Sequence, residues 1–198
     1  MNLGNFASQK YFDQRIQGDT NFVLPGFHFV QTNSLTPIST LLGSCVSACI
    51  YDTKANIGGL NHFLLPEQDK LSNACQSSRY GVHAMEVLIN DLLKSGARKI
   101  NLAAKVFGGA KVIQSASSET VGTQNCEFVK SYLNSEKIPI SAEDLGGEQA
   151  RRIYFFSDSG RVSVLRIPLV GNEELRLKDI EMRKKALEKH KNGGVELF

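Results

Sequence analysis

The sequence has no closely paired cysteines and no long apolar run. Its four cysteines, Cys45, Cys49, Cys75 and Cys126, show no C-x-x-C spacing, which removes a common signature of structural zinc sites. No apolar segment approaches the ~20 residues that a membrane-spanning helix requires. The first ten residues lack the apolar core of a signal peptide. We therefore expect a protein of the reducing cytoplasm, with free thiols and no membrane insertion.

An excess of charge of one sign is also missing. The chain has 23 Lys and Arg against 20 Asp and Glu, a net charge of +3, and the basic residues form no stripe before the C-terminal tail. A nucleic-acid-binding protein would need a stronger basic patch, so we expect no nucleic-acid partner. The paired glycines Gly108 and Gly109 belong to neither a G-x-x-x-x-G-K-[ST] nor a Rossmann pattern. We expect them to permit close backbone packing rather than to bind a nucleotide.

The composition that remains is that of an ordinary globular protein. With 198 residues, 41% hydrophobic and 22% charged, the chain is most simply one domain with a substantial core. Apolar residues at helical spacing predict helices over residues 80–95 and 123–136. Strands are predicted over residues 27–30, 100–106 and 138–142, with a hairpin over 153–166. This pattern predicts an α/β fold, a single-domain layered sandwich with a mixed or antiparallel sheet and two main helices packed on it.

Both ends of the chain are expected to lie outside this domain. Residues 1–20 are polar and aperiodic, which predicts a flexible N-terminal arm. Residues 178–198 are basic and only weakly apolar, which predicts a helical tail with a solvated surface. The domain itself would then span residues 21–177.

Two short apolar runs form the centre of the sequence. One follows Gly43-Ser44-Cys45, and the other, residues 57–66, opens with paired glycines and passes through His62. The five-residue connection, residues 52–56, predicts an antiparallel hairpin in which the start of one strand lies near the end of the other. Cys45 and His62 would then lie at the same end. Each alone is typical of a protein core, but a thiol beside an imidazole forms a nucleophile with its base.

Several sequence blocks occur in the order and spacing of a known family. They are Thr40-Leu41-Leu42-Gly43-Ser44-Cys45-Val46, Gly59-Leu60-Asn61-His62-Phe63-Leu64-Leu65-Pro66, Arg79-Tyr80-Gly81, Ala84-Met85, Ala104-Lys105-Val106-Phe107-Gly108-Gly109-Ala110, Gly122 with Asn125, and Ala142-Glu143-Asp144-Leu145-Gly146-Gly147. On these blocks the chain resembles the chemoreceptor glutamine deamidase family, CheD, from about residue 20 to residue 167. One such block would be weak, whereas the ordered series is specific.

The resemblance implies a layered α/β sandwich and an enzyme of chemotaxis, a protein-glutamine glutaminase. Members of the family hydrolyse side-chain amides of particular chemoreceptor glutamines to glutamate and ammonia, and some bind a CheC-type phosphatase. The resemblance also implies Cys45 as nucleophile, His62 as base and Thr40 as the residue that orients His62. Backbone N–H groups around Gly43 and Ser44 are the candidates to hold the oxyanion. This chemistry needs no metal and no organic cofactor.

Three further residues of the matching blocks, Asn61, Gly108 and Gly109, are expected to support the site. One assignment stays open at this point. Some family members have one more residue between the threonine and the Gly-Ser-Cys turn, and that spacing would select Ser39 instead of Thr40. The text of the Thr-Leu-Leu-Gly-Ser-Cys block favours Thr40, and its β-branched side chain is the stiffer of the two.

Three other interpretations use the same residues. A zinc site made from Cys45, Cys49 and His62 would be one ligand short of the four that a structural site takes. A cysteine peptidase would use the same thiol and imidazole and would differ only in its substrate groove. A non-catalytic adaptor for a CheC-type phosphatase would keep the fold but would not need Cys45 and His62, so their presence argues against it as the sole role.

Overall fold

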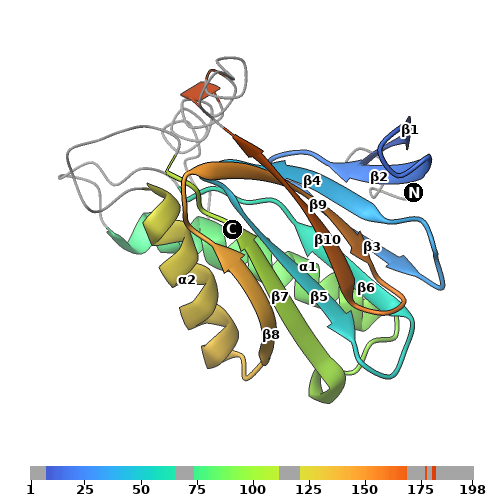
Figure 1. The fold of residues 1–198 in the computed structure, drawn as a ribbon. Helices are drawn as coiled ribbons and strands as arrows, with labels where there is room; N and C mark the ends of the chain where they lie inside the picture. The colour runs from blue at the N-terminus through green and yellow to red at the C-terminus, as the bar shows by residue number, and fades with distance from the viewer. Residues whose placement is uncertain (1–7, 66–73, 112–120, 169–176, 178–179, 182–198) are drawn as a thin grey trace, which may run out of the picture.

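The computed structural model describes residues 8–65, 74–111, 121–168, 177, 180 and 181, with side chains described from residue 79 onwards in the first helix. Within these residues, ten strands form two five-stranded sheets, and two α-helices accompany them (Figure 1). The first sheet contains, in spatial order, β1 (Ser8–Asp13), β2 (Gly18–Val23), β4 (Ile38–Leu42), β9 (Gln149–Phe156) and β10 (Arg161–Pro168). The second contains β3 (His28–Thr32), β6 (Ile57–Asn61), β5 (Val46–Asp52), β7 (Leu102–Gly108) and β8 (Ile140–Leu145). The helices are α1 (Ala74–Lys94) and α2 (Val121–Ser135), and a short 3-10 turn, η2 (Lys99–Asn101), precedes β7.

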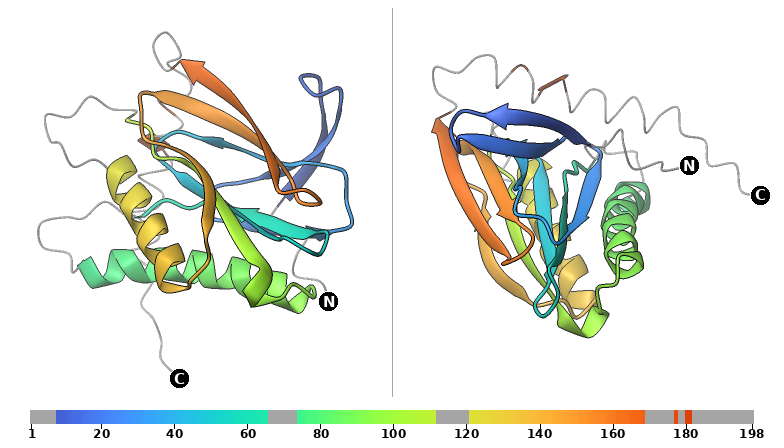
Figure 2. Two further views of the ribbon diagram at one scale, coloured as in Figure 1. Left: turned by 60° about the horizontal axis from the view of Figure 1, so that its bottom comes forward. Right: turned by 90° about the vertical axis from the view of Figure 1, so that its right-hand side faces the viewer.

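The second sheet is the middle layer of the molecule. Both helices lie on one of its faces and the first sheet lies on the other, as the two views of Figure 2 show. Most strand pairs are antiparallel, while β2–β4 and β7–β8 are parallel. The prediction of an α/β layered sandwich with two packed helices is therefore confirmed, and its strands are divided between two sheets.

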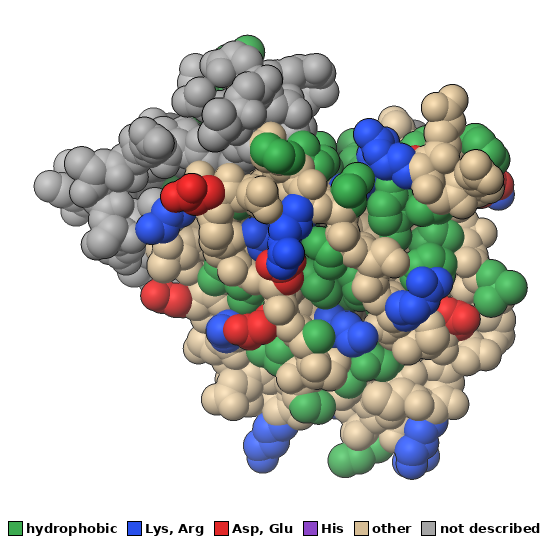
Figure 3. Space-filling view, viewed as in Figure 1, with side chains coloured by type: hydrophobic (Ala, Val, Ile, Leu, Met, Phe, Trp, Pro, Cys, Tyr) green, Lys and Arg blue, Asp and Glu red, His purple; other side chains and the backbone are tan. Residues whose placement is uncertain are grey.

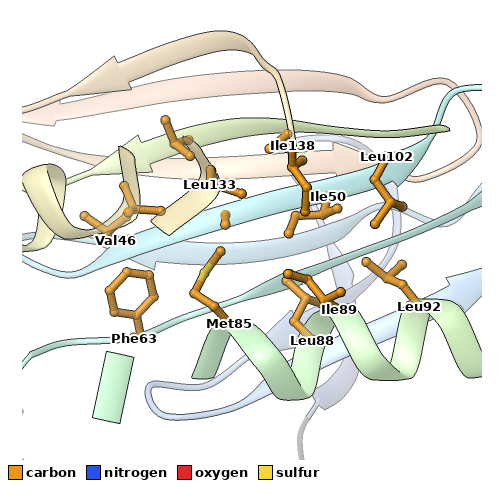
Figure 4. Close-up of a cluster of buried hydrophobic side chains, with 14 of the residues drawn as sticks. Val46, Ile50, Phe63, Met85, Leu88, Ile89, Leu92, Leu102, Leu133 and Ile138 are labelled. Atoms are coloured by element: carbon orange, nitrogen blue, oxygen red, sulfur yellow. The ribbon is translucent and has the colours of Figure 1, made fainter. Parts of the chain in front are cut away.

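The central strand β5 is buried on both faces, which explains its nearly continuous apolar sequence. Val46, Ala48 and Ile50 point to the helices and join a cluster with residues of α1 and α2. Figure 4 shows this cluster, in which Met85, Leu88 and Leu92 of α1 and Leu133 of α2 lie over β5. The alternate residues, Cys45 and Cys49, point to the first sheet and pack in a second cluster with Leu42, Leu60, Ile153 and Phe155.

The two predicted helices are present with shifted ends. Helix α1 begins six residues before the predicted residue 80, because the polar stretch that opens it carries no apolar periodicity. It ends at Lys94, and Gly96, the expected stop, follows with a φ of 102°, the left-handed conformation that follows many helices. Met85, Leu88, Ile89 and Leu92 are buried as the apolar stripe predicts, and His83 is exposed.

A flexible arm was expected over residues 1–20, whereas most of the described part of this segment belongs to strands β1 and β2. Strands β1 and β2 form a hairpin at the edge of the first sheet, with Ser8 opposite Val23. Polar contacts hold much of this hairpin in place: Tyr154 donates a 2.8 Å hydrogen bond to Asp13, and Arg152 pairs with Asp13 at 3.1 Å. Because these contacts are polar, the segment shows no apolar pattern in the sequence. Most of the predicted tail, residues 178–198, lies outside the described residues.

No helix in the described part of the chain is long and apolar enough to cross a membrane. On the face shown in Figure 3, basic and acidic side chains alternate instead of gathering by sign. Ion pairs such as Lys130–Glu143 at 2.7 Å and Arg166–Asp144 at 3.0 Å account for part of this mixing.

Candidate active site

The hairpin of β5 and β6 brings Cys45 and His62 to one end of the second sheet. Cys49 lies opposite Leu60, and the bridge between Val46 and Phe63 continues the same register. In this register Cys45 and His62 are diagonal neighbours on one face, a position from which side chains roughly 7–8 Å apart can still meet. Both residues are buried, and Cys45 forms no disulfide bond with another described residue. The predicted hairpin is therefore present, with its two polar residues on the side that faces the first sheet.

The ring of His62 is hydrogen-bonded to Thr40, on strand β4 of the first sheet. Thr40 Oγ1 lies 2.7 Å from His62 Nδ1, and the same hydroxyl donates a 2.8 Å hydrogen bond to the carbonyl of Val23. A hydroxyl carries one proton, so Thr40 accepts from an Nδ1–H group. His62 Nε2 is then the unprotonated nitrogen. It is buried and has no hydrogen-bond partner within the described residues, which leaves its lone pair available to accept a proton.

Burial lowers the pKa of His62 to about 4, although the Val23 carbonyl acts in the opposite direction by stabilising the protonated ring. The imidazole is therefore neutral at pH 7, as a general base must be. An ordinary thiol has a pKa of about 8.5 and is mostly protonated at this pH, so it needs such a base to become a nucleophile.

The same shift predicts a pH dependence of stability. As the pH falls below 6.5, the unfolded chain protonates its histidine first, so the free energy of unfolding should fall by about 3 kcal/mol between pH 6.5 and pH 4. Below both pKa values this loss should be complete. In His62→Gln the loss should be smaller by that amount, because no buried imidazole remains to resist protonation. Urea titrations across this pH range measure it, and His83→Gln, at an exposed position, should behave like the wild type. Identical curves for His62→Gln and the wild type would contradict the shift.

The carbonyl groups of the turn before β5, residues 43–45, accept hydrogen bonds from other segments, and these bonds fix the position of the turn. The Gly43 carbonyl accepts the Ala110 N–H at 2.8 Å, and the Cys45 carbonyl accepts the Gly109 N–H at 2.8 Å. The Ser44 carbonyl accepts a 3.0 Å bond from the side chain of Asn125. In a trans peptide the next N–H points away from the carbonyl. The N–H groups of Ser44 and Cys45 therefore point away from the groups that bind the Gly43 and Ser44 carbonyls.

The glycines Gly108 and Gly109 are required by this close packing. Both have positive φ, 114° and 72°. A Cβ on Gly108 would lie 2.1 Å from the Cys45 carbonyl oxygen, and a Cβ on Gly109 would lie 2.1 Å from the sulfur of Cys126. The expectation that the glycine pair permits close packing beside the hairpin is confirmed.

This geometry predicts a large difference between two glycine substitutions. Gly146→Ala places a side chain at a φ of 73° with nothing within 4 Å of the new Cβ, so it should cost only the conformational strain, about 1–2 kcal/mol. Gly108→Ala adds a clash with the backbone of Cys45 and should cost roughly 3 kcal/mol or more. Thermal unfolding measures both costs. Equal losses in the two variants would show that the contact with Cys45 is unimportant.

Two buried asparagines fasten the hairpin to the helices. Asn61 accepts the Ala48 N–H at 3.0 Å and donates to the carbonyl of Ala84 in α1 at 3.1 Å. Asn125 of α2 accepts the Leu65 N–H at 2.8 Å in addition to binding Ser44. Asn61 was among the expected supporting residues, whereas Asn125 was given no role from the sequence. The available signal was its position between Val121 and Val129 on the buried stripe of α2, where a polar residue needs a buried partner.

The alternative zinc site of Cys45, Cys49 and His62 has little support in the described residues. Cys49 is buried, and burial raises the pKa of its thiol, which disfavours the thiolate that a metal would need. No group of three or more potential metal ligands occurs in the described part of the chain.

The choice between Ser39 and Thr40 is decided by their hydrogen bonds. The hydroxyl of Ser39 is buried and has no hydrogen-bond partner among the described residues, whereas the hydroxyl of Thr40 contacts His62.

Comparisons with known proteins point to one family. The family model described as CheD chemotactic sensory transduction matches residues 64–166. A protein of Stenotrophomonas maltophilia (strain K279a) named probable chemoreceptor glutamine deamidase CheD is 47% identical over 189 residues, which cover 96% of this chain and 94% of that relative. A protein of Dechloromonas aromatica (strain RCB) named probable chemoreceptor glutamine deamidase CheD 1 is 42% identical over 194 residues, which cover 98% of this chain and 96% of that relative.

Proposed function

The chain belongs to the CheD family, and on that premise we propose that it hydrolyses side-chain amides of chemoreceptor glutamines to glutamate and ammonia. We propose Cys45 as the nucleophile, His62 as the general base and Thr40 as the residue that orients it. The observation that supports this assignment most directly is the hydrogen bonding of the two ring nitrogens of His62. Its Nδ1 is hydrogen-bonded to Thr40, and its Nε2 has no hydrogen-bond partner among the described residues. The side chain lies on the same face of the sheet as Cys45.

The first step is attack on the glutamine side chain. The Cys45 thiol gives its proton to His62 Nε2, and Sγ forms a bond to the carbonyl carbon of the amide. The electron pair of the C=O double bond moves to the oxygen, which becomes an oxyanion. We propose that the N–H groups of Ser44 and Cys45 hold this oxyanion, because the Gly43 and Ser44 carbonyls are turned the other way.

The second step expels ammonia. The oxyanion returns its electron pair to carbon, the C–N bond breaks, and the leaving nitrogen takes the proton from His62 Nε2. A thioester between Cys45 and the receptor side chain remains. A water molecule then gives a proton to His62 Nε2 while its oxygen attacks the thioester carbon, which forms a second oxyanion. When this oxyanion re-forms the C=O bond, the C–S bond breaks, the Cys45 sulfur takes the proton back from His62 Nε2, and the glutamate product leaves. A positioned acid–base group of this kind is worth roughly 10²–10⁴ in rate.

The orienting role of Thr40 predicts a difference between two neighbouring substitutions. Thr40→Val keeps the shape of the side chain but removes the oxygen that receives Nδ1–H, so kcat should fall by about 10–100-fold with little change in KM. Ser39→Ala should remain near normal, because the Ser39 hydroxyl makes no hydrogen bond within the described residues. Steady-state ammonia release measures both variants. The reverse order of activities would move the orienting role to Ser39.

The proposed function is tested with the cytoplasmic domain of a candidate chemoreceptor. Purified protein should release ammonia from that domain, and peptide masses should show specific glutamines converted to glutamate with the backbone intact. Backbone cleavage at those sites would indicate a cysteine peptidase instead. Failure to release ammonia from any receptor domain of the same cell would contradict the proposal.

Binding to a CheC-type phosphatase and location in the cytoplasm also belong to this proposal. Such binding would not require the buried pair of His62 and Thr40, whereas hydrolysis does. A protein with Cys45→Ala should therefore lose deamidation but keep any phosphatase binding, which separates the adaptor role from the catalytic one.

A further inference from the structure

Tyr80 lies in the second turn of α1, at the end of the helix that approaches the site. The backbone of the next residue, Gly81, is held tightly there. A Cβ on Gly81 would lie 2.6 Å from the ring of Phe128 and 2.7 Å from a methyl group of Leu65. Helix α1 is therefore docked directly against α2 and against the chain that follows His62, and the position of Tyr80 relative to the site is fixed by this docking.

The hydroxyl of Tyr80 lies beside the turn that holds the backbone of His62. It is 3.4 Å from the position that a Cβ on Gly26 would occupy. Gly26 donates a 2.7 Å hydrogen bond to the carbonyl of His62, and the carbonyl of Phe27 accepts the His62 N–H at 2.9 Å. Burial raises the pKa of Tyr80, and the negative charge of a Cys45 thiolate raises this pKa further. The phenol thus stays protonated beside the turn that binds the backbone of His62.

The Tyr80 hydroxyl differs from other tyrosine hydroxyls of the chain in its hydrogen bonding. The side chain is only partly exposed, and the hydroxyl makes no hydrogen bond within the described part of the chain. By contrast, the hydroxyls of Tyr11 and Tyr154 donate to Asp13 at 3.1 and 2.8 Å, and that of Tyr51 meets Ser141 at 3.3 Å. A protonated phenol beside the backbone of the proposed base can donate a hydrogen bond to a bound substrate.

We propose that the Tyr80 hydroxyl donates a hydrogen bond to the amide oxygen of the substrate glutamine and holds it more strongly as that oxygen becomes an oxyanion. The inference rests on the proposed function and adds a side-chain donor to the backbone N–H groups of the turn. No proton is transferred from the phenol. Because the bond strengthens as negative charge develops, its loss should lower kcat rather than raise KM.

The test is Tyr80→Phe, which removes one oxygen and keeps the ring. With the receptor cytoplasmic domain as substrate, kcat should fall by about 10²-fold while KM stays within about twofold. The rate of Cys45 alkylation by iodoacetamide should not change, because that reaction uses no substrate carbonyl. The matched control is Tyr132→Phe, on α2, where burial and nearby Glu136 raise the pKa of the tyrosine to about 12. This control should keep the wild-type kcat.

Each alternative outcome has a definite meaning. A kcat within about twofold of the wild type, or a rise in KM alone, overturns the inference and leaves the proposed function standing. Slower alkylation in Tyr80→Phe would show that the phenol acts on the thiol and also overturns it. Alkylation and circular dichroism together report whether the variant is folded, and Tyr80→His, which keeps a ring and restores an N–H donor, should recover part of kcat. A wild-type protein that releases no ammonia overturns the proposed function and this inference with it.

Discussion

Cys45→Ala is expected to abolish deamidation while leaving the fold intact. The thiol is the proposed nucleophile, and enzymes that lose their nucleophile retain little activity, so ammonia release should fall by roughly 10⁴-fold or more. The side chain is small and buried, so its truncation should cost only about 1 kcal/mol of stability. Steady-state ammonia release and thermal unfolding measure the two quantities. Turnover near the wild-type rate in a folded variant would remove Cys45 from the mechanism.

Cys49→Ala is the matched control for this experiment. Cys49 lies on the same face as Cys45, is equally buried and belongs to the same apolar cluster. It lies opposite Leu60 and, like Cys45, is a diagonal neighbour of His62, but burial raises the pKa of its thiol, which disfavours a thiolate there. We therefore expect the same small loss of stability with activity largely retained. If Cys49→Ala is as inactive as Cys45→Ala, a site that uses both thiols must be considered again.

His62→Gln should lower kcat by about 10³-fold, because the thiol then has no base to accept its proton. In the wild type, kcat/KM should fall on the acidic side near pH 4, since burial lowers the pKa of His62 to about 4. This acidic limb should be missing from the residual activity of the variant. Alkylation of Cys45 by iodoacetamide should also be slower. His83→Gln, at an exposed position of α1, is the control and should keep the wild-type profile. Equal alkylation rates for His62→Gln and the wild type between pH 5 and pH 8 would show that His62 does not activate the thiol.

The central hairpin could be predicted because its signals are local. The loop length, the paired glycines and the two apolar runs all lie within residues 43–66, so the relative position of Cys45 and His62 follows from strand pairing alone. The helices were predictable for the same reason, since the buried stripe of α1 recurs at 3–4-residue intervals.

The parts that the sequence did not predict depend on contacts between distant segments. The contact between Thr40 and His62 joins the two sheets; the resemblance favoured Thr40, but strand periodicity alone did not decide between Thr40 and Ser39, whose side chains alternate along β4. Asn125 reaches the Ser44 carbonyl from 81 positions away in the sequence, so no local pattern reports that bond. The hairpin of β1 and β2 is held partly by Asp13, Arg152 and Tyr154, which are polar, and apolar periodicity does not detect such contacts.

The central claim, that Cys45 forms a thioester with the receptor glutamine, is tested most directly by trapping. The protein is mixed with the receptor cytoplasmic domain, and one half of the reaction is quenched with acid while the other half receives hydroxylamine. Intact masses of the acid-quenched sample should show an adduct equal to enzyme plus receptor domain minus ammonia, carried on Cys45 and missing from Cys45→Ala. Hydroxylamine should release the adduct and leave a hydroxamate at the modified glutamine. Ammonia release with neither the adduct nor the hydroxamate would contradict the claim and would mean that water attacks the amide directly.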